Sequence, residues 1–393
     1  MQMPVEPYSF PAPGRLIDAM RQADEPGLRN LAAGVPSPDI LPAEALSAAW
    51  DAAQARDGKA LWAYHHPEGD PELRERLGGL LRSRGINVGS GEVMTTTGCS
   101  QGLALAVDLL VRPGDIVACE VPAYYGLLEL LARAGARILE LPVTGPDGFD
   151  PAWLAAVCER WRPKALFTCP ALANPTGSTL PAEARPRVVE ICRQYGVQIV
   201  EDDIYALLEA EGSAPPLRAF DPAGELVTLV SSFSKIVSPG LRLGYALPAR
   251  ALREAFAERK VQLDMHSAVP TEATMREFLA AGRLEPHLTG LRERFLGVTR
   301  RAAAVIAAEF PTGTTLGPVR GNYMLWVELP HAVDMAQLAA VARKEAIVFC
   351  PGAIFFTRPT DQRFMRLNCA KLPEPELLQA LKRLGELART AMP

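Results

Sequence analysis

The sequence of 393 residues contains no long apolar run. The longest candidate, residues 103–111, is interrupted by Asp108 and falls short of the roughly 20 apolar residues that a membrane-spanning helix needs. The first residues show no basic stretch followed by an apolar one, so a secretory signal peptide is not expected. These absences predict a cytoplasmic protein with no membrane partner.

Metal-binding and disulfide patterns are missing as well. None of the seven cysteines forms a Cys-x-x-Cys pair, and His65 and His66 are adjacent rather than spaced as zinc ligands. Several cysteines stand in apolar runs, which is typical of buried thiols in a reducing compartment. The net charge is only −4 and no strongly basic segment is present, so no nucleic-acid partner is expected.

What the chain does contain is a regular alternation of strand-like and helix-like segments. Short, nearly all-apolar runs predict strands at residues 93–97, 116–121, 137–141, 165–169, 197–201, 226–231 and 243–247. Helical patterns lie between most of them, at 101–111, 124–134, 151–161 and 182–195. This alternation predicts an α/β domain with a mainly parallel seven-stranded sheet between helices.

The C-terminal third changes character. Helical patterns at 249–259, 271–280, 288–310 and 335–345 surround strand-like runs at 323–329 and 364–369, which predicts a smaller α+β domain. The first 45 residues, rich in proline and glycine, suggest an arm. We therefore expect an arm and crossover at 1–45 that belongs to the small domain, a large domain at 46–285 and a small domain at 286–393.

The most informative segment surrounds Lys235. This lysine follows Ser232 and Ser234, and Arg242 comes seven residues later. A lysine amine can form a Schiff base with an aldehyde cofactor, while neighbouring hydroxyl groups and a guanidinium bind its phosphate. An exposed lysine beside a serine-rich turn explains the same residues, so the pattern leaves both interpretations open.

Further motifs follow other predicted strands, and ligands bind at the carboxyl ends of parallel strands. Cys99, Ser100 and Gln101 follow Gly98 and open a predicted helix, whose free N–H groups favour a phosphate. Ordinary N-capping by Ser100 is the alternative. Tyr124, after the next strand, suits stacking on a flat ring, or packing in the core.

Two more strand ends carry polar side chains. Asn174 precedes a proline whose peptide bond could be cis, and its amide could reach a phenolic oxygen, although a plain turn explains it too. Asp202 could keep a pyridine nitrogen protonated, with Tyr205 near the phenolic oxygen, although strand-end carboxylates also cap helices. Each motif is weak alone, but their order predicts one cofactor site.

In these motifs and their order, the chain resembles the fold-type I pyridoxal-phosphate enzymes of the class I/II aminotransferase family. Within it, the chain is similar to the 2-aminoadipate and broad-specificity aminotransferases. The resemblance implies pyridoxal 5′-phosphate as cofactor, a homodimer with shared active sites, and Lys235, Asp202 and Tyr205 as catalytic residues. The other implied cofactor contacts are Cys99, Ser100, Gln101, Tyr124, Asn174, Ser232, Ser234, Arg242 and Tyr64 of the partner subunit.

The resemblance also implies how a substrate is held. Arg366 matches the arginine that grips the substrate α-carboxylate, with Asn174 assisting, and Gly34 lies in a turn near the substrate. Arg15 could meet an acidic substrate side chain, or be a plain surface arginine. Asn322 replaces a glycine more usual in the family, which predicts a change in side-chain recognition at this position and at its neighbour, Tyr323.

The implied function is transfer of an amino group from an L-amino acid to a 2-oxo acid through an aldimine at Lys235. Elimination or replacement at the β- or γ-carbon, or cyclisation, uses the same residues and remains an alternative. A third reading, a regulator domain that senses the cofactor, needs an additional basic DNA-binding domain that this sequence does not contain. The sequence names neither the amino donor nor the acceptor.

Overall fold

The computed structural model describes residues 6–10, 25–210, 212–358 and 363–392. The larger of its two sheets has seven strands in the order β2-β8-β7-β6-β5-β3-β4. β8 is antiparallel to both neighbours, and the other pairings are parallel. The strands are β2 (Met94–Thr96), β3 (Ile116–Val121), β4 (Arg137–Pro142), β5 (Ala165–Thr168), β6 (Gln198–Asp202), β7 (Val227–Ser232) and β8 (Gly244–Leu247). The predicted fold class is confirmed.

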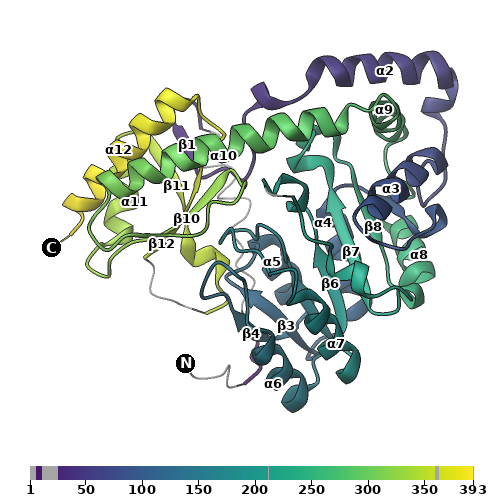
Figure 1. The fold of residues 1–393 in the computed structure, drawn as a ribbon, viewed down its shortest axis with the longest axis horizontal. Coiled ribbons are helices and arrows are strands. Elements are labelled where there is room, and N and C mark those ends of the chain that lie inside the picture. The colour runs from purple at the N-terminus through teal and green to yellow at the C-terminus, as the bar shows by residue number, and fades with distance from the viewer. Residues whose placement is uncertain (1–5, 11–24, 211, 359–362, 393) are drawn as a thin grey trace.

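Helices cover both faces of this sheet (Figure 1). Because side chains alternate along a strand, Val117 packs in the core beneath one set of helices and Ala118 in the core beneath the other. The first core lies against α4 (Cys99–Leu110), α5 (Tyr125–Arg133) and α8 (Arg253–Asp264). The second lies against α6 (Pro151–Trp161) and α7 (Arg185–Tyr195).

Three helices form the outer side of the large lobe. They are α2 (Ala43–Asp57), α3 (Pro71–Ser83) and α9 (Val269–Ala280). The sequence pattern predicted no helix over the first two and only part of the third. α9 packs against both α2 and α3. Arg276 of α9 joins them through ion pairs to Asp57 at 2.5 Å and Asp70 at 2.6 Å.

The small lobe has its own sheet in the order β1-β11-β12-β10-β9. Its strands are β1 (Arg29–Leu31), β9 (Thr315–Leu316), β10 (Met324–Glu328), β11 (Ile347–Pro351) and β12 (Phe364–Asn368). β1 pairs with β11, so the N-terminal arm contributes a strand to this sheet. α11 (Met335–Lys344) and α12 (Glu374–Thr390) pack against each other, and α12 also packs on α10.

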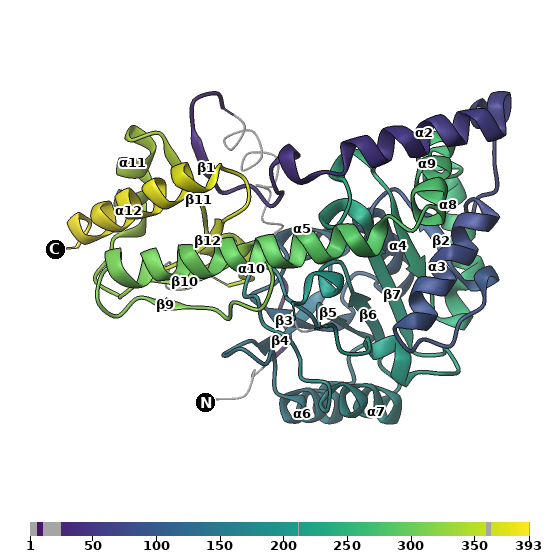
Figure 2. The same cartoon turned by 45° about the horizontal axis from the view of Figure 1, so that its top comes forward.

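The long helix α10 (Leu284–Glu309) extends from the large lobe into the small one, as Figures 1 and 2 show from two directions. The boundary expected near residue 285 therefore falls at the start of a continuous helix. Tyr8, in the N-terminal arm, contacts the edge of the large sheet. It bridges to Ile138 of β4, and its hydroxyl donates to Glu140 at 2.6 Å.

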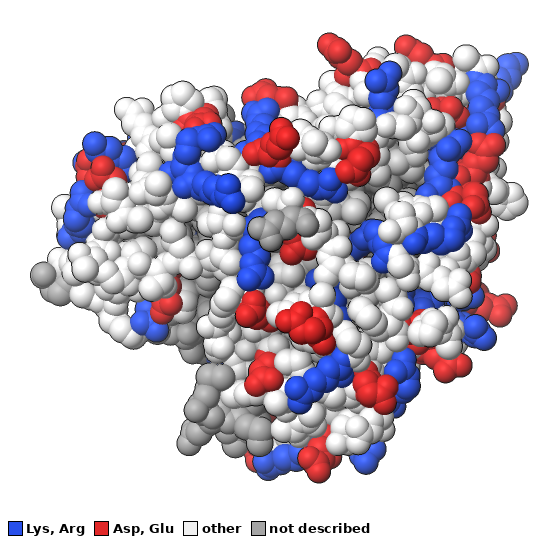
Figure 3. All heavy atoms as spheres, in the orientation of Figure 1, with Lys and Arg blue, Asp and Glu red and all other residues white. Residues whose placement is uncertain are grey.

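The surface carries both signs of charge, interspersed over the face drawn in Figure 3. This agrees with a net charge of only −4. None of the described helices combines the length and apolar composition needed to cross a bilayer. Within the described residues, no cluster of histidine, cysteine and carboxylate side chains is arranged to hold a metal ion.

Candidate active site

Lys235 lies directly after β7, in the 3-10 turn Phe233–Lys235. Ser232 begins this turn, because its Oγ accepts from Ser234 N at 3.1 Å. The Lys235 ammonium donates to the main-chain oxygen of Gly34 at 2.7 Å. Hydrogen bonds thus fix both the start of the turn and the Lys235 side chain. The lysine is not the exposed surface residue that the sequence alone allowed.

Two arginines flank this lysine. Burial, and then the positive charges of Arg366 and Arg242, lower the pKa of Lys235 to about 8 against an opposing effect of Asp202. A buried amine with a lowered pKa is available as a nucleophile and as a proton carrier near neutral pH. The electrostatics therefore agree with the catalytic role expected of Lys235.

Arg242 lies against the turn that opens α4. Its guanidinium donates to Ser234 Oγ at 3.4 Å and to Thr97 O at 3.5 Å. Gly98 adopts φ 77°, and a Cβ on it would lie 2.7 Å from Arg242 Nη2. The backbone angle therefore favours glycine here, and any Cβ at this position would displace the Arg242 guanidinium. The result is a cation beside the free N–H groups of a helix N-terminus, a combination that suits a phosphate.

Gln101 and Tyr124 both make contacts within the protein. Gln101 Nε2 donates to Asp264 at 2.6 Å, and its Oε1 accepts from Thr97 N at 2.8 Å. The side chain is thus engaged within the protein, which leaves its main-chain N–H for a ligand. The Tyr124 ring lies against Gly126, where a Cβ would come within 2.6 Å of it. Ser100, in contrast, is exposed at the start of α4.

Asp202 ends β6 and is buried. Its Oδ1 accepts from Cys99 Sγ and from Ile204 N, each at 3.3 Å, and neither bond involves Oδ2. Burial raises the pKa of Asp202 to about 6, although the two bonds favour the ionised form. Burial, and then the Asp202 charge, raise the pKa of the Cys99 thiol, so the thiol remains a donor. A cation beside Asp202 would stabilise its charged form.

Arg366 of β12 is fully buried. Its Nη1 donates to Asn174 Oδ1 and its Nη2 to Ala32 O, both at 2.9 Å. Its Nε is buried and has no hydrogen-bond partner among the described residues. No described carboxylate forms an ion pair with it either, and its guanidinium lies 5.1 Å from the centre of the Phe355 ring. A buried cation with an unused donor suits an incoming carboxylate.

The N-terminal arm lies over this arginine. A Cβ on Gly34 would come within 3.5 Å of Arg366 Nη2. Asn368 Nδ2 donates to Ala33 O at 2.5 Å and to Val35 O at 2.8 Å, so it holds the arm on both sides of Gly34. Sequence reasoning assigned no role to Asn368. The available signal was a polar residue two positions after Arg366, on the same face of a strand.

Three further predicted residues, Tyr205, Asn322 and Tyr323, are buried. The hydroxyl of Tyr323 donates to Gly34 O at 3.0 Å. Burial raises the pKa of Tyr205 well above 10, so its hydroxyl is a neutral donor. Asn322 donates to Leu172 O at 3.1 Å and accepts from Met324 N at 3.2 Å. Both ends of the Asn322 amide thus bind main-chain groups of the protein. A role of Asn322 in substrate recognition stays a prediction.

Tyr64 is not brought to the Lys235 site of its own chain. It is 84% exposed, and its ring meets His266 edge-on at 5.6 Å between centroids. The cis peptide bond expected at Asn174-Pro175 is present. Arg15 lies outside the described residues.

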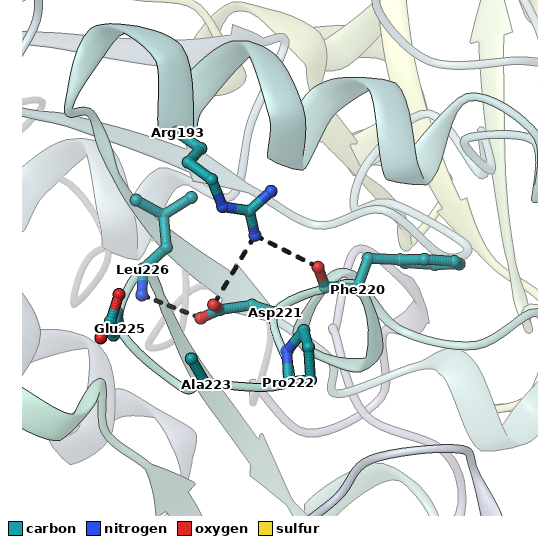
Figure 4. A pocket seen from close by; sticks show the side chains of 7 residues that line it. All are labelled: Arg193, Phe220, Asp221, Pro222, Ala223, Glu225 and Leu226. Carbon is teal, nitrogen blue, oxygen red and sulfur yellow. Dashed lines mark hydrogen bonds and ion pairs between the residues drawn. The ribbon is translucent and has the colours of Figure 1, made fainter.

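A separate surface pocket of about 360 Å³ opens beside Asp221 (Figure 4). It precedes β7, whereas Lys235 follows the same strand, so the two lie at opposite edges of the sheet. Asp221 Oδ2 accepts from Leu226 N at 2.8 Å, and Arg193 donates to Phe220 O at 3.4 Å. The polar groups that line this pocket thus shape the local turn. The pocket forms no part of the candidate active site.

The family model described as aminotransferase class I and II matches residues 27–384. The chain belongs to this family. It is 29% identical over 373 residues to a 2-aminoadipate transaminase of Thermus thermophilus, covering 94% of this chain and 92% of that protein. The crystal structure of LysN, an α-aminoadipate aminotransferase of Thermus thermophilus, superposes with a TM-score of 0.88 at 28% identity, covering 95% of both chains.

A third relative is an uncharacterized HTH-type transcriptional regulator of Escherichia coli K12, which is 30% identical over 325 residues. The match covers 82% of this chain and 69% of the regulator. The predicted family, the fold-type I architecture and the transferase class are confirmed. The candidate active site of this aminotransferase combines residues that follow five strands with Arg366 of β12 and the N-terminal arm.

Proposed function

We propose that this aminotransferase uses pyridoxal 5′-phosphate to move an amino group from an L-amino acid to a 2-oxo acid. The observation that carries the proposal is the state of Arg366, a buried guanidinium without a carboxylate partner among the described residues. Arg366 and Arg242 both act on the pKa of Lys235. An amine between two anion-binding groups suits a phosphate on one side and a substrate carboxylate on the other.

Particular residues would hold the cofactor. Arg242, Ser234 and the N–H groups that open α4 fit its phosphate. Asp202 fits its ring nitrogen, and Lys235 its aldehyde carbon. When bound, the cofactor supplies an electron sink for the charge that develops at the substrate Cα.

The protein's own residues then handle the substrate and the proton. Arg366 orients the carboxylate, and Asn174 braces the guanidinium at 2.9 Å. Lys235 Nζ, with its pKa lowered to about 8, would take the proton from the substrate Cα and deliver it to the cofactor's aldehyde carbon. Gly34, which lies over Arg366, covers the site on the side of the arm.

A second copy of the chain completes the site in this proposal. Large apolar side chains are exposed at Trp62 (74%), Tyr64 (84%), Leu263 (57%) and Met265 (51%). Tyr64 touches His266, so these residues come from two neighbouring segments. Exposed apolar clusters of this kind mark contact surfaces, and most oligomers of one chain are symmetric dimers. Tyr64 would then reach the phosphate site of the partner.

The test is spectroscopic and chemical. Purified protein loaded with pyridoxal 5′-phosphate should absorb in the visible and respond to borohydride. A screen of amino acids with 2-oxoglutarate or pyruvate should release a keto acid together with the new amino acid. Free ammonia without a new amino acid would instead favour an elimination reaction.

The Lys235→Ala variant should lose the turnover, and borohydride should no longer fix the cofactor to the protein. Lys164→Ala is the matched control, because the Lys164 side chain is 59% exposed and pairs with Asp115 at 3.6 Å, away from Lys235 in sequence. A Lys235→Ala protein with undiminished turnover would refute the proposal.

A further inference from the structure

Asp264, the last residue of α8, contacts the turn that opens α4. Its Oδ2 accepts from the Thr97 hydroxyl at 2.8 Å and from Gln101 Nε2 at 2.6 Å. Gln101 Oε1 accepts in turn from Thr97 N at 2.8 Å. The three residues therefore close a ring of hydrogen bonds across the turn that contains Gly98.

A buried lysine holds the other oxygen of this carboxylate. Lys260 Nζ donates to Asp264 Oδ1 at 3.0 Å, and the Lys260 side chain has 0% exposure. A buried ammonium is costly unless it is paired. Partial burial acts to raise the pKa of Asp264, but the bonds from Gln101, Lys260 and Thr97 together lower it, so the side chain is a carboxylate at neutral pH.

The same turn carries the groups that suit a phosphate. Arg242 donates to Thr97 O at 3.5 Å, so the position of Thr97 affects the guanidinium as well as the N–H groups of α4. The turn is also confined from behind, because a Cβ on Gly244 would lie 2.7 Å from the Gly98 carbonyl carbon. Asp264 is thus the side chain that ties the open side of the turn to α8.

We propose that Asp264 is a positioning residue for phosphate binding, acting through Thr97 and Gln101 and supported by Lys260. This inference rests on the proposed cofactor, since the phosphate in question belongs to pyridoxal 5′-phosphate. Asp264 itself touches neither cofactor nor substrate in this scheme. Its effect is to hold the donors of the 97–101 turn in one arrangement before the phosphate binds.

Two ligands separate this role from a general one. Pyridoxal 5′-phosphate and pyridoxal share the ring and the aldehyde, but only the former carries a phosphate. The Asp264→Asn variant should bind pyridoxal 5′-phosphate about ten- to a hundredfold more weakly, because it disturbs charged hydrogen bonds. Its affinity for pyridoxal should stay within about twofold, because the turn then has no phosphate to hold. Dissociation constants come from absorbance titrations of protein freed of cofactor.

Asp108→Asn is the matched control. Asp108 of α4 also pairs with α8, accepting from Arg259 Nε at 2.6 Å, but it does not touch the turn. It should leave both affinities unchanged. Thr97→Val removes one of the two donors to Asp264 Oδ2 and should give a smaller, phosphate-selective loss, which tests the role in a second protein should Asp264→Asn fold poorly.

The outcomes distinguish the two proposals. Wild-type protein that binds neither ligand refutes the proposed function, and the role of Asp264 falls with it. Wild-type protein that binds the phosphorylated ligand tightly, with Asp264→Asn and Thr97→Val both binding it equally well, overturns the positioning role alone. An equal loss for both ligands also overturns it, since the effect would then not depend on the phosphate.

Discussion

Arg366 in the small lobe donates to the side-chain oxygen of Asn174 in the large lobe at 2.9 Å. The contact joins β12 to the turn after β5, and it fixes which way the guanidinium faces. Since Arg366 Nε has no partner among the described residues, the bond to Asn174 orients a cation that still has a donor to offer. Substrate binding should therefore depend on both residues.

The Arg366→Lys variant should raise KM for the amino acid about tenfold or more, because lysine cannot reproduce the planar fork of a guanidinium. Affinity for pyridoxal 5′-phosphate should change far less. Steady-state kinetics and cofactor titrations measure the two effects. Arg301→Lys, at a half-exposed arginine paired with Glu374, is the control. An unchanged KM in Arg366→Lys would contradict the assignment of the carboxylate site.

Gly98→Ala should weaken cofactor binding, because its new Cβ would lie 2.7 Å from Arg242 Nη2. Gly114→Ala is a close control: Gly114 has φ 88°, similar to φ 77° at Gly98, but nothing lies within 4 Å of its Cβ position. Both positions have a positive φ, so the control variant carries backbone strain of its own without a collision at its Cβ. Equal cofactor affinities would show that Arg242 can move without consequence.

Glu120→Gln should stabilise the protein at pH 8 and not at pH 5. Burial raises the pKa of Glu120 from 4.5 to about 7, while bonds from Cys169 N and the Thr168 hydroxyl oppose the shift. The folded state thus binds the proton more tightly, and wild-type stability falls as pH rises from 4.5 through about 7.

The neutral glutamine removes this titration, so its advantage at pH 8 should be on the order of 3 kcal/mol. Thermal or denaturant unfolding at both pH values measures it. Glu183→Gln, at an exposed site, is the control. A constant difference between Glu120→Gln and wild type across the range would contradict the assigned titration.

Mixing two impaired variants should restore activity if the sites are shared. A dimer of one Lys235→Ala chain and one Tyr64→Ala chain contains one site with both wild-type residues. Random pairing should return about a quarter of wild-type turnover. Each variant incubated with itself is the control, and sedimentation measures the dimer. A mixture no more active than the average of its parents would exclude shared sites.

The sheet could be predicted because its strands are apolar on both faces and separated by helical periods. β1 and β9 were not predicted. β1 has three residues and β9 has two, and strands this short show no apolar alternation. α10 begins earlier than expected, at Leu284, because Pro286 lies in its first turn, where a missing N–H costs no helical bond.

The strand-end motifs supplied most of the residues of the candidate site, but they could not show how these side chains pair. Gln101 reads as a phosphate ligand in sequence, and only the fold brings Asp264, 163 residues away, to its amide. Asn368 likewise depends on the path of the arm, which no local pattern specifies. Contacts between distant segments are the part that a single sequence does not encode locally.

The carbonyl oxygen of Gly34 accepts two hydrogen bonds, from Lys235 at 2.7 Å and from Tyr323 at 3.0 Å. Lys235 belongs to the large lobe, and Tyr323 lies in the small lobe, directly before β10. The chemical state of the lysine nitrogen is thus linked to the arm: whenever that nitrogen no longer donates, Tyr323 alone holds Gly34 from this side. Hydrogen exchange of the arm's amides, compared between wild type and Lys235→Ala, should register the lost bond as faster exchange. A catalytic step that changes the lysine nitrogen would then also change the number of hydrogen bonds that hold the N-terminal arm.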